Sequence, residues 1–347
     1  MTHLWVRAEQ RPQEERVGIT PEGVAALIAR GFQVTIEDSP CRALPFAPYL
    51  EAGAEAAPYG SWPDAPEDAI IFGLKELPED DSPLRHRHIM FGHAFKGQPA
   101  GQRLLARFRA GGGVLYDLEY LTNDQGRRVV AFGYWAGYAG AAVSLLAFAA
   151  QARGDICPPV ARFADRHTMA HAVAEALSGL AAPRVLIIGA LGRVGTGAAD
   201  LCAAAGATTT RWDMAETAHG GPFPEVLAHD VFLNCILASP GTPVFVTADA
   251  VTSPRALRVI GDIACDPTSE FSPVKVYDRV TDWENPVLRV ATDPVLDVMA
   301  IDNLPSLLPV ESSHDFAAQL LPHLLGLDDL SAGVWGRAGA VFEQHRA

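Results

Sequence analysis

Short apolar runs alternate with helical patterns through the first part of the chain. Runs bounded by turn residues predict buried strands, and these lie at His3–Arg7, Gln33–Glu37, Ala69–Gly73, His88–Gly92 and Val114–Asp117. Between them, helices are predicted at Pro21–Ala29, with Thr20 as N-cap and Pro21 at the first helical position, and at Ala100–Ala110. This alternation is typical of a parallel sheet with helices on both faces.

The same rhythm returns in the second half of the chain. Phe132–Ala152 is helical in composition and is predicted to link the two halves, and Thr168–Ser178 predicts a further helix. Strands are predicted in the run VLII from Val185 and at Ala207–Trp212, Asp230–Cys235, Arg258–Asp262 and Pro286–Ala291. The segment from Pro309 to Ala347 is helical again and is expected to return to the first domain. We therefore expect an α/β chain of two domains, divided near Phe132–Ala136.

A glycine-rich turn follows the strand that begins at Val185. The glycines Gly189, Gly192 and Gly195 precede a predicted small-residue helix, Gly197–Ala205. A strand, glycine turn and helix in this order place a pyrophosphate on a helix N-terminus, where N–H groups and the helix dipole meet its charge. The spacing departs from G-x-G-x-x-G because Leu191 holds the second glycine position, so a glycine-rich turn of another α/β protein is the alternative.

Asp213 ends the next predicted strand, eighteen residues beyond Gly195. A carboxylate at this place accepts hydrogen bonds from an adenosine ribose and repels a 2′-phosphate. The sequence therefore predicts NAD rather than NADP as the cofactor.

Composition limits the partners. The 347 residues carry a formal charge of −14, which argues against nucleic acid and anionic membranes. Met1–Gly18 lacks the pattern of a signal peptide, and the longest apolar stretch, Ala136–Ala150, is short and rich in Gly and Ala, so a buried helix is expected there. Five cysteines without metal spacing predict reduced thiols, a cytoplasmic protein and no metal site.

Candidate chemistry lies where two apolar runs of the first domain end. Lys75 follows AIIFG, and His93 and Lys96 follow HIMFG. Ligands of open α/β sheets bind beyond the carboxyl ends of strands, and there desolvation and nearby cations turn a lysine into a usable base. The alternative is that these residues are solvated loop groups. Arg11, Arg16, Arg127 and Arg128 form either a carboxylate-binding group or a surface charge balance with neighbouring acids.

The remaining histidines and Cys235 favour ordinary roles. His86 and His88 in PLRHRH are expected in a solvated turn. His167 and His171 are spaced i, i+4, but no third ligand of zinc spacing accompanies them. Cys235, within FLNCIL, is expected to be a small buried hydrophobe.

Together these segments resemble the NAD-dependent, lysine-forming saccharopine dehydrogenases, relatives of alanine dehydrogenase and transhydrogenase domains. The resemblance covers essentially the whole chain and rests on RAEQRPQEERVGITP, VTIEDSP, IIFGLKELPE, HIMFGHAFKGQ, LYDLEYLTNDQGRRVVAFG, VLIIGALGRVGTGA, GGPFPE, FLNCI and IDNLPSLLPVESS. It implies two Rossmann-like, doubly wound domains with the active site in the cleft between them. Their expected bounds are 1–132 with 312–347 for the substrate-side domain and 133–311 for the NAD-binding domain.

The resemblance also implies roles for single residues. Lys75 matches the base toward the secondary amine, His93 the acid–base histidine, and Glu76 and Glu119 the acids that tune them. The expected substrate-binding residues are Arg11, Arg16, Lys96 and Arg128. The expected NAD-binding residues are Gly189, Gly192, Arg193, Val194, Gly195, Asp213 and Asp302, the last close to the nicotinamide.

The implied reaction is reversible: saccharopine, NAD and water give L-lysine, 2-oxoglutarate and NADH. The expected partners are thus small molecules, an amino acid and a 2-oxo acid, and the sequence is compatible with a monomer. The chain departs from the fungal pattern at three positions: Arg11 stands in place of a lysine, Val194 in place of a cysteine, and Val310 in place of an arginine. Because Val194 replaces the cysteine, no disulfide from this position to Cys235 can form. These leave two alternatives open, an enzyme for another amine or 2-oxo acid in secondary metabolism and a catalytically silent NAD-binding sensor.

Overall fold

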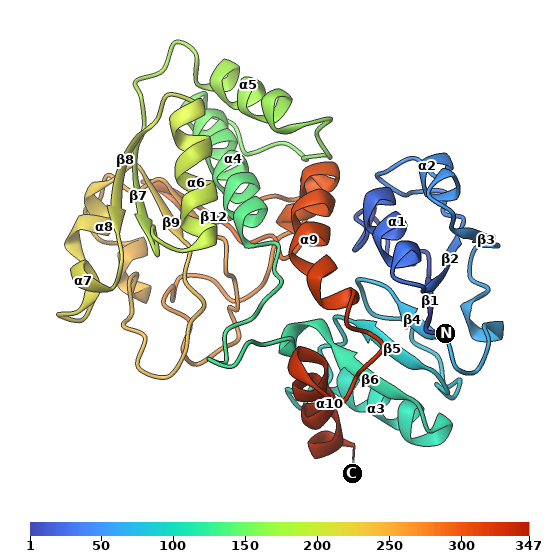
Figure 1. Ribbon diagram of the computed structural model, residues 1–347. Helices are drawn as coiled ribbons and strands as arrows, with labels where there is room; N and C mark the ends of the chain where they lie inside the picture. Colours follow the sequence, from blue (N-terminus) through green and yellow to red (C-terminus); the bar gives the residue numbers. More distant parts are fainter. Residues whose placement is uncertain (347) are drawn as a thin grey trace. The chain divides into compact units, whose positions relative to one another are not determined.

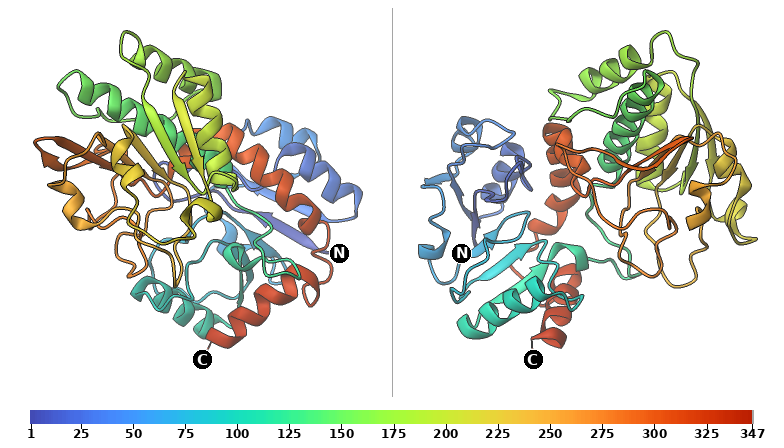
Figure 2. Two further views of the ribbon diagram at one scale, coloured as in Figure 1. Left: turned by 90° about the vertical axis from the view of Figure 1, so that its left-hand side faces the viewer. Right: turned by 180° about the vertical axis from the view of Figure 1, so that it is seen from behind.

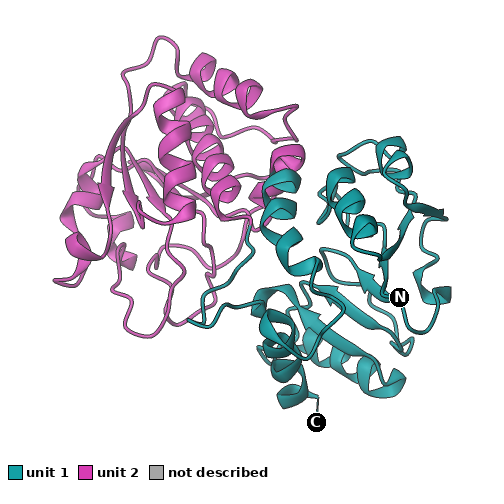
Figure 3. Cartoon of the chain, in the orientation of Figure 1, with its two compact units in different colours: residues 1–131, 312–347 teal, residues 132–311 magenta. Residues whose placement is uncertain are grey.

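The computed structural model describes residues 1–346 and divides the chain into two compact α/β units (Figure 3). Unit 1 comprises Met1–Ala131 and the C-terminal segment from Ser312, and unit 2 comprises Phe132–Glu311. The domain boundaries expected from the sequence lie after residue 132 and before residue 312, next to the unit boundaries in the structure. The assignment of substrate to one unit and of NAD to the other stays a prediction.

Unit 1 is built on a parallel sheet in the order β3-β2-β1-β4-β5-β6 (Figure 1). Its strands are β1 (His3–Val6), β2 (Gln33–Glu37), β3 (Glu55–Ala57), β4 (Ile70–Phe72), β5 (Arg87–Met90) and β6 (Val114–Asp117). The order reverses between β1 and β4, and in such sheets the ligand crevice opens at the carboxyl ends of these two strands. The short strand β3 was missed because Glu55 and Ala56 are exposed at the sheet edge and give no apolar run.

The helices of unit 1 begin and end at ordinary signals. They are α1 (Pro21–Ala29), α2 (Ala47–Glu51), α3 (Pro99–Gly111) and α10 (Gly333–His345), with short 3-10 turns η1 (Trp62–Asp64) and η2 (Leu118–Tyr120). The Thr20 hydroxyl accepts a hydrogen bond from Gly23 N at 3.3 Å, which confirms the predicted N-cap. Gly112 ends α3 with a left-handed φ of 78°.

The C-terminal segment packs on unit 1, as expected. Helix α9 (Pro309–Leu324) crosses the unit boundary, and Val17 N donates to Ser313 Oγ at 2.9 Å. Helix α10 lies along β6 (Figures 1 and 2), with Phe342 fully buried in the core of this unit against Phe108. The segment is two helices rather than one, since residues 325–332 form turns.

Unit 2 carries a second sheet, in the order β11-β12-β10-β9-β7-β8. Its strands are β7 (Arg184–Ile188), β8 (Thr208–Trp212), β9 (Val231–Asn234), β10 (Val259–Asp262), β11 (Leu288–Thr292) and β12 (Val295–Met299). All pairs are parallel except β11 with β12. Strand β12 was missed because Asp297 interrupts its apolar run; this carboxylate is fully buried and accepts from Arg289 and Gln151.

The helices of unit 2 cover this sheet. They are α4 (Gly133–Ala152), α5 (Arg166–Leu177), α6 (Arg193–Ala204), α7 (Met214–Thr217) and α8 (Pro224–Ala228), together with the 3-10 turns η3 (Ala248–Val251) and η4 (Leu304–Leu307). Helix α4, expected as a link between the halves, is instead a core helix of unit 2. It is long and apolar enough to cross a membrane, yet most of it is buried, as in the core of a folded domain.

Small residues let α4 lie directly on α6. A Cβ added at Gly137 would lie 1.8 Å from Val194 O, and one added at Gly197 would lie 1.9 Å from Tyr134 O. The Gly- and Ala-rich composition of this stretch is therefore explained by close helix packing.

The prediction of a solvated turn at His86 and His88 is wrong. Both side chains are buried, because β5 begins at Arg87 and runs between β4 and β6. His88 packs edge-on against Trp62 and Phe108, and its burial lowers its pKa well below the usual value.

Candidate active site

Three neighbouring strands of unit 1 bring the predicted chemical groups to one edge of the sheet. Because β1, β4, β5 and β6 are parallel neighbours, their carboxyl ends lie side by side. The turn after β4 carries Lys75 and Glu76, the turn after β5 carries His93, and Glu119 follows β6. The edge includes the reversal point between β1 and β4, where this type of sheet binds ligands.

Lys75 lies half-buried among charged groups. Burial, followed by the nearby Arg16 and to a smaller extent Arg11, lowers its pKa, while Glu76 and Glu14 act in the opposite direction. A lowered pKa increases the share of neutral amine near neutral pH. The predicted environment of a lysine base, desolvated and close to cations, is thus present around this residue.

His93 stands between two carboxylates. Its Nε2 lies 3.3 Å from Glu76 Oε1 and its Nδ1 lies 3.4 Å from Glu119 Oε2. The residue has a φ of 47°, in the left-handed region that residues other than glycine adopt uncommonly, and its ring stacks on Phe91. Strain of this kind is kept where surrounding contacts impose it, often at functional sites.

The ionised form of Glu119 is stabilised by three neighbouring side chains of the cluster. Contact with His93, together with Lys96 and Arg128, lowers the pKa of its carboxyl to about 2 against the cost of burial. The two cations make the shorter contacts, since Lys96 Nζ and Arg128 Nη2 each lie 3.0 Å from Glu119 Oε1. Glu119 therefore stays ionised at neutral pH. Lys96 and Arg128, expected to bind substrate, are bonded to it here while remaining partly exposed.

Asp117 forms hydrogen bonds to the main chain beside His93 and at Glu119, and the sequence analysis did not identify it. Its fully buried carboxylate accepts from Gly92 N at 3.2 Å and from Glu119 N at 2.9 Å, the main-chain groups next to His93 and at Glu119 itself. Burial raises the pKa of Asp117 to about 6. Its only sequence signal was a carboxylate at the end of the apolar run VLYD.

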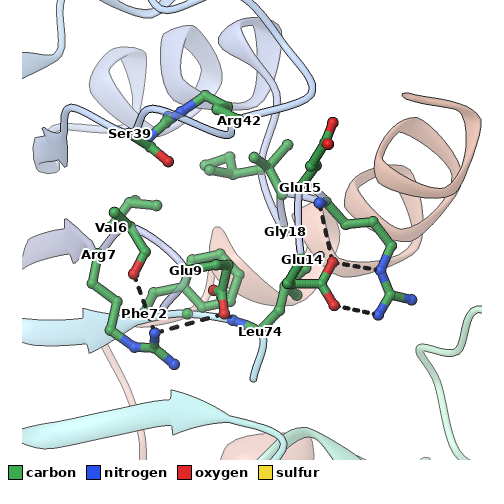
Figure 4. A pocket seen from close by; sticks show the side chains of 15 residues that line it. Val6, Arg7, Glu9, Glu14, Glu15, Gly18, Ser39, Arg42, Phe72 and Leu74 are labelled. Carbon is green, nitrogen blue, oxygen red and sulfur yellow. Dashed lines mark hydrogen bonds and ion pairs between the residues drawn. The ribbon is translucent and has the colours of Figure 1, made fainter. Parts of the chain in front are cut away.

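Arg16 is placed differently from an open carboxylate-binding group. Its guanidinium forms a two-pronged, buried ion pair with Glu14, at 2.7 and 2.6 Å. This pair lines a small cavity of about 20 Å³ near Arg7 and Glu9 (Figure 4), which has room for about one water molecule. Arg11 lies on the surface with its guanidinium 4.0 Å from Glu76. The roles of Arg11 and Arg16 toward substrate stay predictions.

Arg127 and Arg128 follow a tight turn at residues 123–126. Asn123 Oδ1 accepts from Gln125 N and Arg127 N, and Gly126 has a φ of 73°. Arg128 is joined to the Lys75–His93 edge through Glu119.

The glycine turn of unit 2 has the expected strand–turn–helix form, but its helix begins earlier than predicted. Helix α6 starts at Arg193 rather than Gly197, with Gly192 as N-cap, so Arg193, Val194 and Gly195 form its first turn. Gly189 has a φ of 88°, and a Cβ added at Gly195 would lie 2.2 Å from Gly189 O. Both glycines are therefore required by the backbone.

Asp213 ends β8 and holds the glycine turn. Its Oδ2 accepts from Leu191 N at 2.9 Å and its Oδ1 from Met214 N at 2.9 Å, while Glu216 closes a capping box at Asp213 N. The carboxylate thus lies beside the turn that would carry a pyrophosphate. Asp302, the other predicted NAD-binding acid, is exposed and close enough to Cys265 to contribute to the raised pKa of that thiol.

Comparison with known proteins identifies the family. The alanine dehydrogenase/PNT N-terminal domain family matches residues 5–139. The saccharopine dehydrogenase [NAD(+), L-lysine-forming] of Schizosaccharomyces pombe is 45% identical to the chain, with 98% of this chain and 97% of the relative covered. The enzyme of the same name from Yarrowia lipolytica is 43% identical, with 99% and 97% covered. The chain belongs to the saccharopine dehydrogenase family.

Solved structures confirm the fold class. An L-alanine dehydrogenase matches with a TM-score of 0.70 at 19% identity, over 99% of this chain and 94% of its own. A transhydrogenase from Sinorhizobium meliloti matches with a TM-score of 0.63 at 16% identity, over 96% and 97%. The two Rossmann-like domains expected from the family resemblance are thereby confirmed, and the relatives named above are NAD(+)-dependent by name.

The residues present fit a dinucleotide. The first turn of α6 carries main-chain N–H groups that a helix cannot satisfy internally. At Gly192 an added Cβ would meet nothing nearer than Gly189 O at 3.5 Å, so this side of the turn is open. Sequence reasoning missed a polar network at the ends of β9 and β10, where the buried Asp262 accepts from Asn234 Nδ2 at 2.8 Å and from Tyr277 Oη at 2.7 Å.

Proposed function

We propose that the chain catalyses the reversible, NAD-dependent oxidation of the secondary amine saccharopine to L-lysine and 2-oxoglutarate. One observation carries the proposal. Lys75 and His93 stand on adjacent strand ends and share Glu76 as a neighbour, in a chain of this family. Two groups that can exchange protons are thus placed around one reacting nitrogen.

Lys75 is the base in this scheme. Burial and Arg16 lower the pKa of its amine and so favour the neutral form, which takes the proton of the secondary amine as the neighbouring C–H bond is oxidised. NAD, held by the glycine turn and Asp213, supplies the two-electron acceptor when bound. Lysine is suited to this task because desolvation changes its pKa readily.

His93 serves the hydrolytic half of the reaction. Water adds to the imine carbon, and the carbinolamine then loses the amine of lysine, so a proton must leave the water and reach the nitrogen. The His93 ring, flanked by Glu76 and Glu119, can accept and return this proton. The two carboxylates, 3.3 and 3.4 Å from the ring nitrogens, orient the ring.

The cations near the cluster bind the carboxylates of the substrate in this proposal. Arg11, Arg16, Lys96 and Arg128 all lie near this edge of unit 1. Their local charge is needed because the chain as a whole, at −14, repels an anionic oxo acid. Arg128 and Lys96 would exchange part of their contact with Glu119 for the substrate.

The assay is turnover of saccharopine with NAD, followed by the absorbance of NADH, against a panel of other secondary amines and, in reverse, of amino acids paired with 2-oxo acids. We expect saccharopine, and lysine with 2-oxoglutarate, to give the highest kcat/KM. A higher value for another amine or oxo acid would assign the chain to the alternative within this enzyme class. Binding of NAD without turnover of any substrate would support the sensor.

We also propose that the protein works in the cytoplasm on small molecules alone. In support, its five cysteines are all unpaired. Within the described residues, no group of His, Cys, Asp and Glu side chains is arranged to hold a metal. Fractionation of the source cells tests the location, and recovery of the activity with an organelle or a membrane would contradict it.

A further inference from the structure

A buried ion pair that the proposed mechanism does not use forms hydrogen bonds to both main-chain polar groups of Lys75. Glu9, just beyond β1, accepts from Leu74 N at 2.6 Å and from Lys75 N at 3.0 Å, one bond to each carboxylate oxygen. Arg7, which continues β1, donates from Nη2 to Lys75 O. Both the N–H and the C=O of the residue that carries the proposed base are therefore fixed by side chains of the segment that follows the neighbouring strand β1.

Arg7 and Glu9 are joined to each other. Arg7 Nη1 lies 3.6 Å from Glu9 Oε2, and both residues are at least nine-tenths buried. The guanidinium also passes over the turn before Lys75, since a Cβ added at Gly73 would lie 2.4 Å from Arg7 Cζ. A side chain at the position of Gly73 would thus displace the guanidinium that holds Lys75.

Stability alone does not explain why Arg7 and Glu9 are buried as an ion pair. Burying two charges carries a desolvation penalty of several kcal/mol per ion, and buried pairs replaced by apolar residues often leave stability unchanged or improved. Burial raises the pKa of Glu9, opposed by Arg7 and by the two N–H donors. Unlike an apolar pair, Arg7 and Glu9 form hydrogen bonds to both the C=O and the N–H of Lys75.

We propose that Arg7 and Glu9 are positioning residues, which hold the turn after β4 so that the Lys75 amine stays half-buried beside Arg16. The inference rests on the proposed role of Lys75 as base. Neither residue touches the reacting atoms in this scheme. Both act through the main chain of Lys75.

Position and acidity are linked here. The charged groups around the Lys75 amine are Arg16, Glu76, Glu14 and Arg11, and burial is the largest cause of its lowered pKa. A turn released from Arg7 and Glu9 would let the amine reach solvent, and its pKa would rise toward the ordinary value. A higher pKa leaves less neutral base at a given pH, and looser placement lowers the rate further.

The test removes both charges together, in Arg7→Met/Glu9→Gln. The net charge near Lys75 is unchanged, and the variant Gly73→Ala, which keeps both charges, separates the effect of position from that of the field of the pair. We expect kcat for saccharopine oxidation to fall about 10- to 100-fold, and the limb of kcat/KM assigned to Lys75 to move up by about one pH unit. KM for NAD should stay within about twofold, because no contact with the cofactor is removed.

Two further variants keep the test decisive. The matched control is Arg289→Met/Asp297→Asn, which dismantles another Arg–carboxylate pair, at β11 and β12 of unit 2, whose carboxylate is fully buried and whose arginine is partly exposed. It should lower the temperature of unfolding and leave the pH limb unmoved. Gly73→Ala retains both charges but pushes Arg7 away, and it should shift the limb in the same direction even if the double variant fails to fold.

A second readout does not depend on turnover. Acylation of Lys75 by an amine-reactive reagent, followed across pH by peptide mass spectrometry, reports the neutral fraction of its amine. We expect the midpoint to rise in Arg7→Met/Glu9→Gln and in Gly73→Ala. Unchanged midpoints and an unmoved limb in a folded variant would overturn the proposal. Wild-type protein that labels as expected but does not oxidise saccharopine would refute the proposed function instead.

Discussion

Replacement of Glu119 by glutamine tests the electrostatics of the cluster. Its contacts with His93, Lys96 and Arg128 lower the carboxyl pKa from an ordinary value of 4.5 to about 2. A difference of roughly two pH units corresponds to about 3 kcal/mol of interaction that favours the ionised form. The Glu119 side chain is 15% exposed, and its cation partners reach solvent, so we expect a measured loss of about 2 kcal/mol in Glu119→Gln at pH 7.

The dependence on pH follows from the sign of the shift. Because the pKa is lower in the folded state, the carboxylate contributes its full stabilisation above pH 4.5 and loses it as pH falls toward 2. The difference between wild type and Glu119→Gln should therefore be constant from pH 7 to about pH 5 and fall by roughly half near pH 3.

Urea unfolding at several pH values measures this difference. The control is Glu79→Gln, which breaks an ion pair of similar length, 2.6 Å from Arg103, but between exposed side chains. The control should cost less than about 1 kcal/mol at any pH. The electrostatic account of the cluster is wrong if Glu119→Gln costs no more than the control, or if its cost does not fall with pH.

Three further predictions concern binding. Asp213→Ala should lower the preference of the enzyme for NAD over NADP, measured as the ratio of kcat/KM values; comparable efficiency with NADP in wild type would contradict the role of Asp213. Arg128→Ala should raise KM for saccharopine or the oxo acid and leave KM for NAD nearly unchanged, whereas a rise in KM for NAD alone would place Arg128 with the cofactor. Gly195→Ala should weaken NAD binding at least about tenfold by calorimetry, because its Cβ would lie 2.2 Å from Gly189 O, and unaltered affinity would show that the turn does not carry the cofactor.

Local sequence patterns were sufficient for the elements that carry the site. The runs AIIFG and HIMFG each contain a buried parallel strand, and Lys75 and His93 follow these strands as expected. Strong local signals made this possible: apolar runs bounded by turns, and the N-cap at Thr20. The edge strand β3 lacked such a signal, and in β12 a buried aspartate concealed it.

The pairings of the buried charges could not be obtained in this way. Arg7, Glu9 and Asp117 look like ordinary polar residues near strand ends, yet the fold buries them against the backbone of the turns that carry Lys75 and Glu119. His88 was misplaced for the same reason, because alternating polar letters suggested solvent while the neighbouring strands cover the residue. Which charge meets which backbone group depends on strand order, and strand order is a property of the whole sheet.

The most direct test of the central claim is the pH profile of kcat/KM for saccharopine in wild type, Lys75→Met and His93→Gln. Each substitution should lower kcat by about two orders of magnitude with little change in NAD affinity, because general acid–base groups contribute 10²- to 10⁴-fold. The wild-type rate should rise with pH through the lowered pKa of Lys75, and this limb should vanish or shift in Lys75→Met. The double variant should lose less than the product of the two effects if the residues act as a unit. Near-wild-type turnover in both single variants would contradict the proposed mechanism.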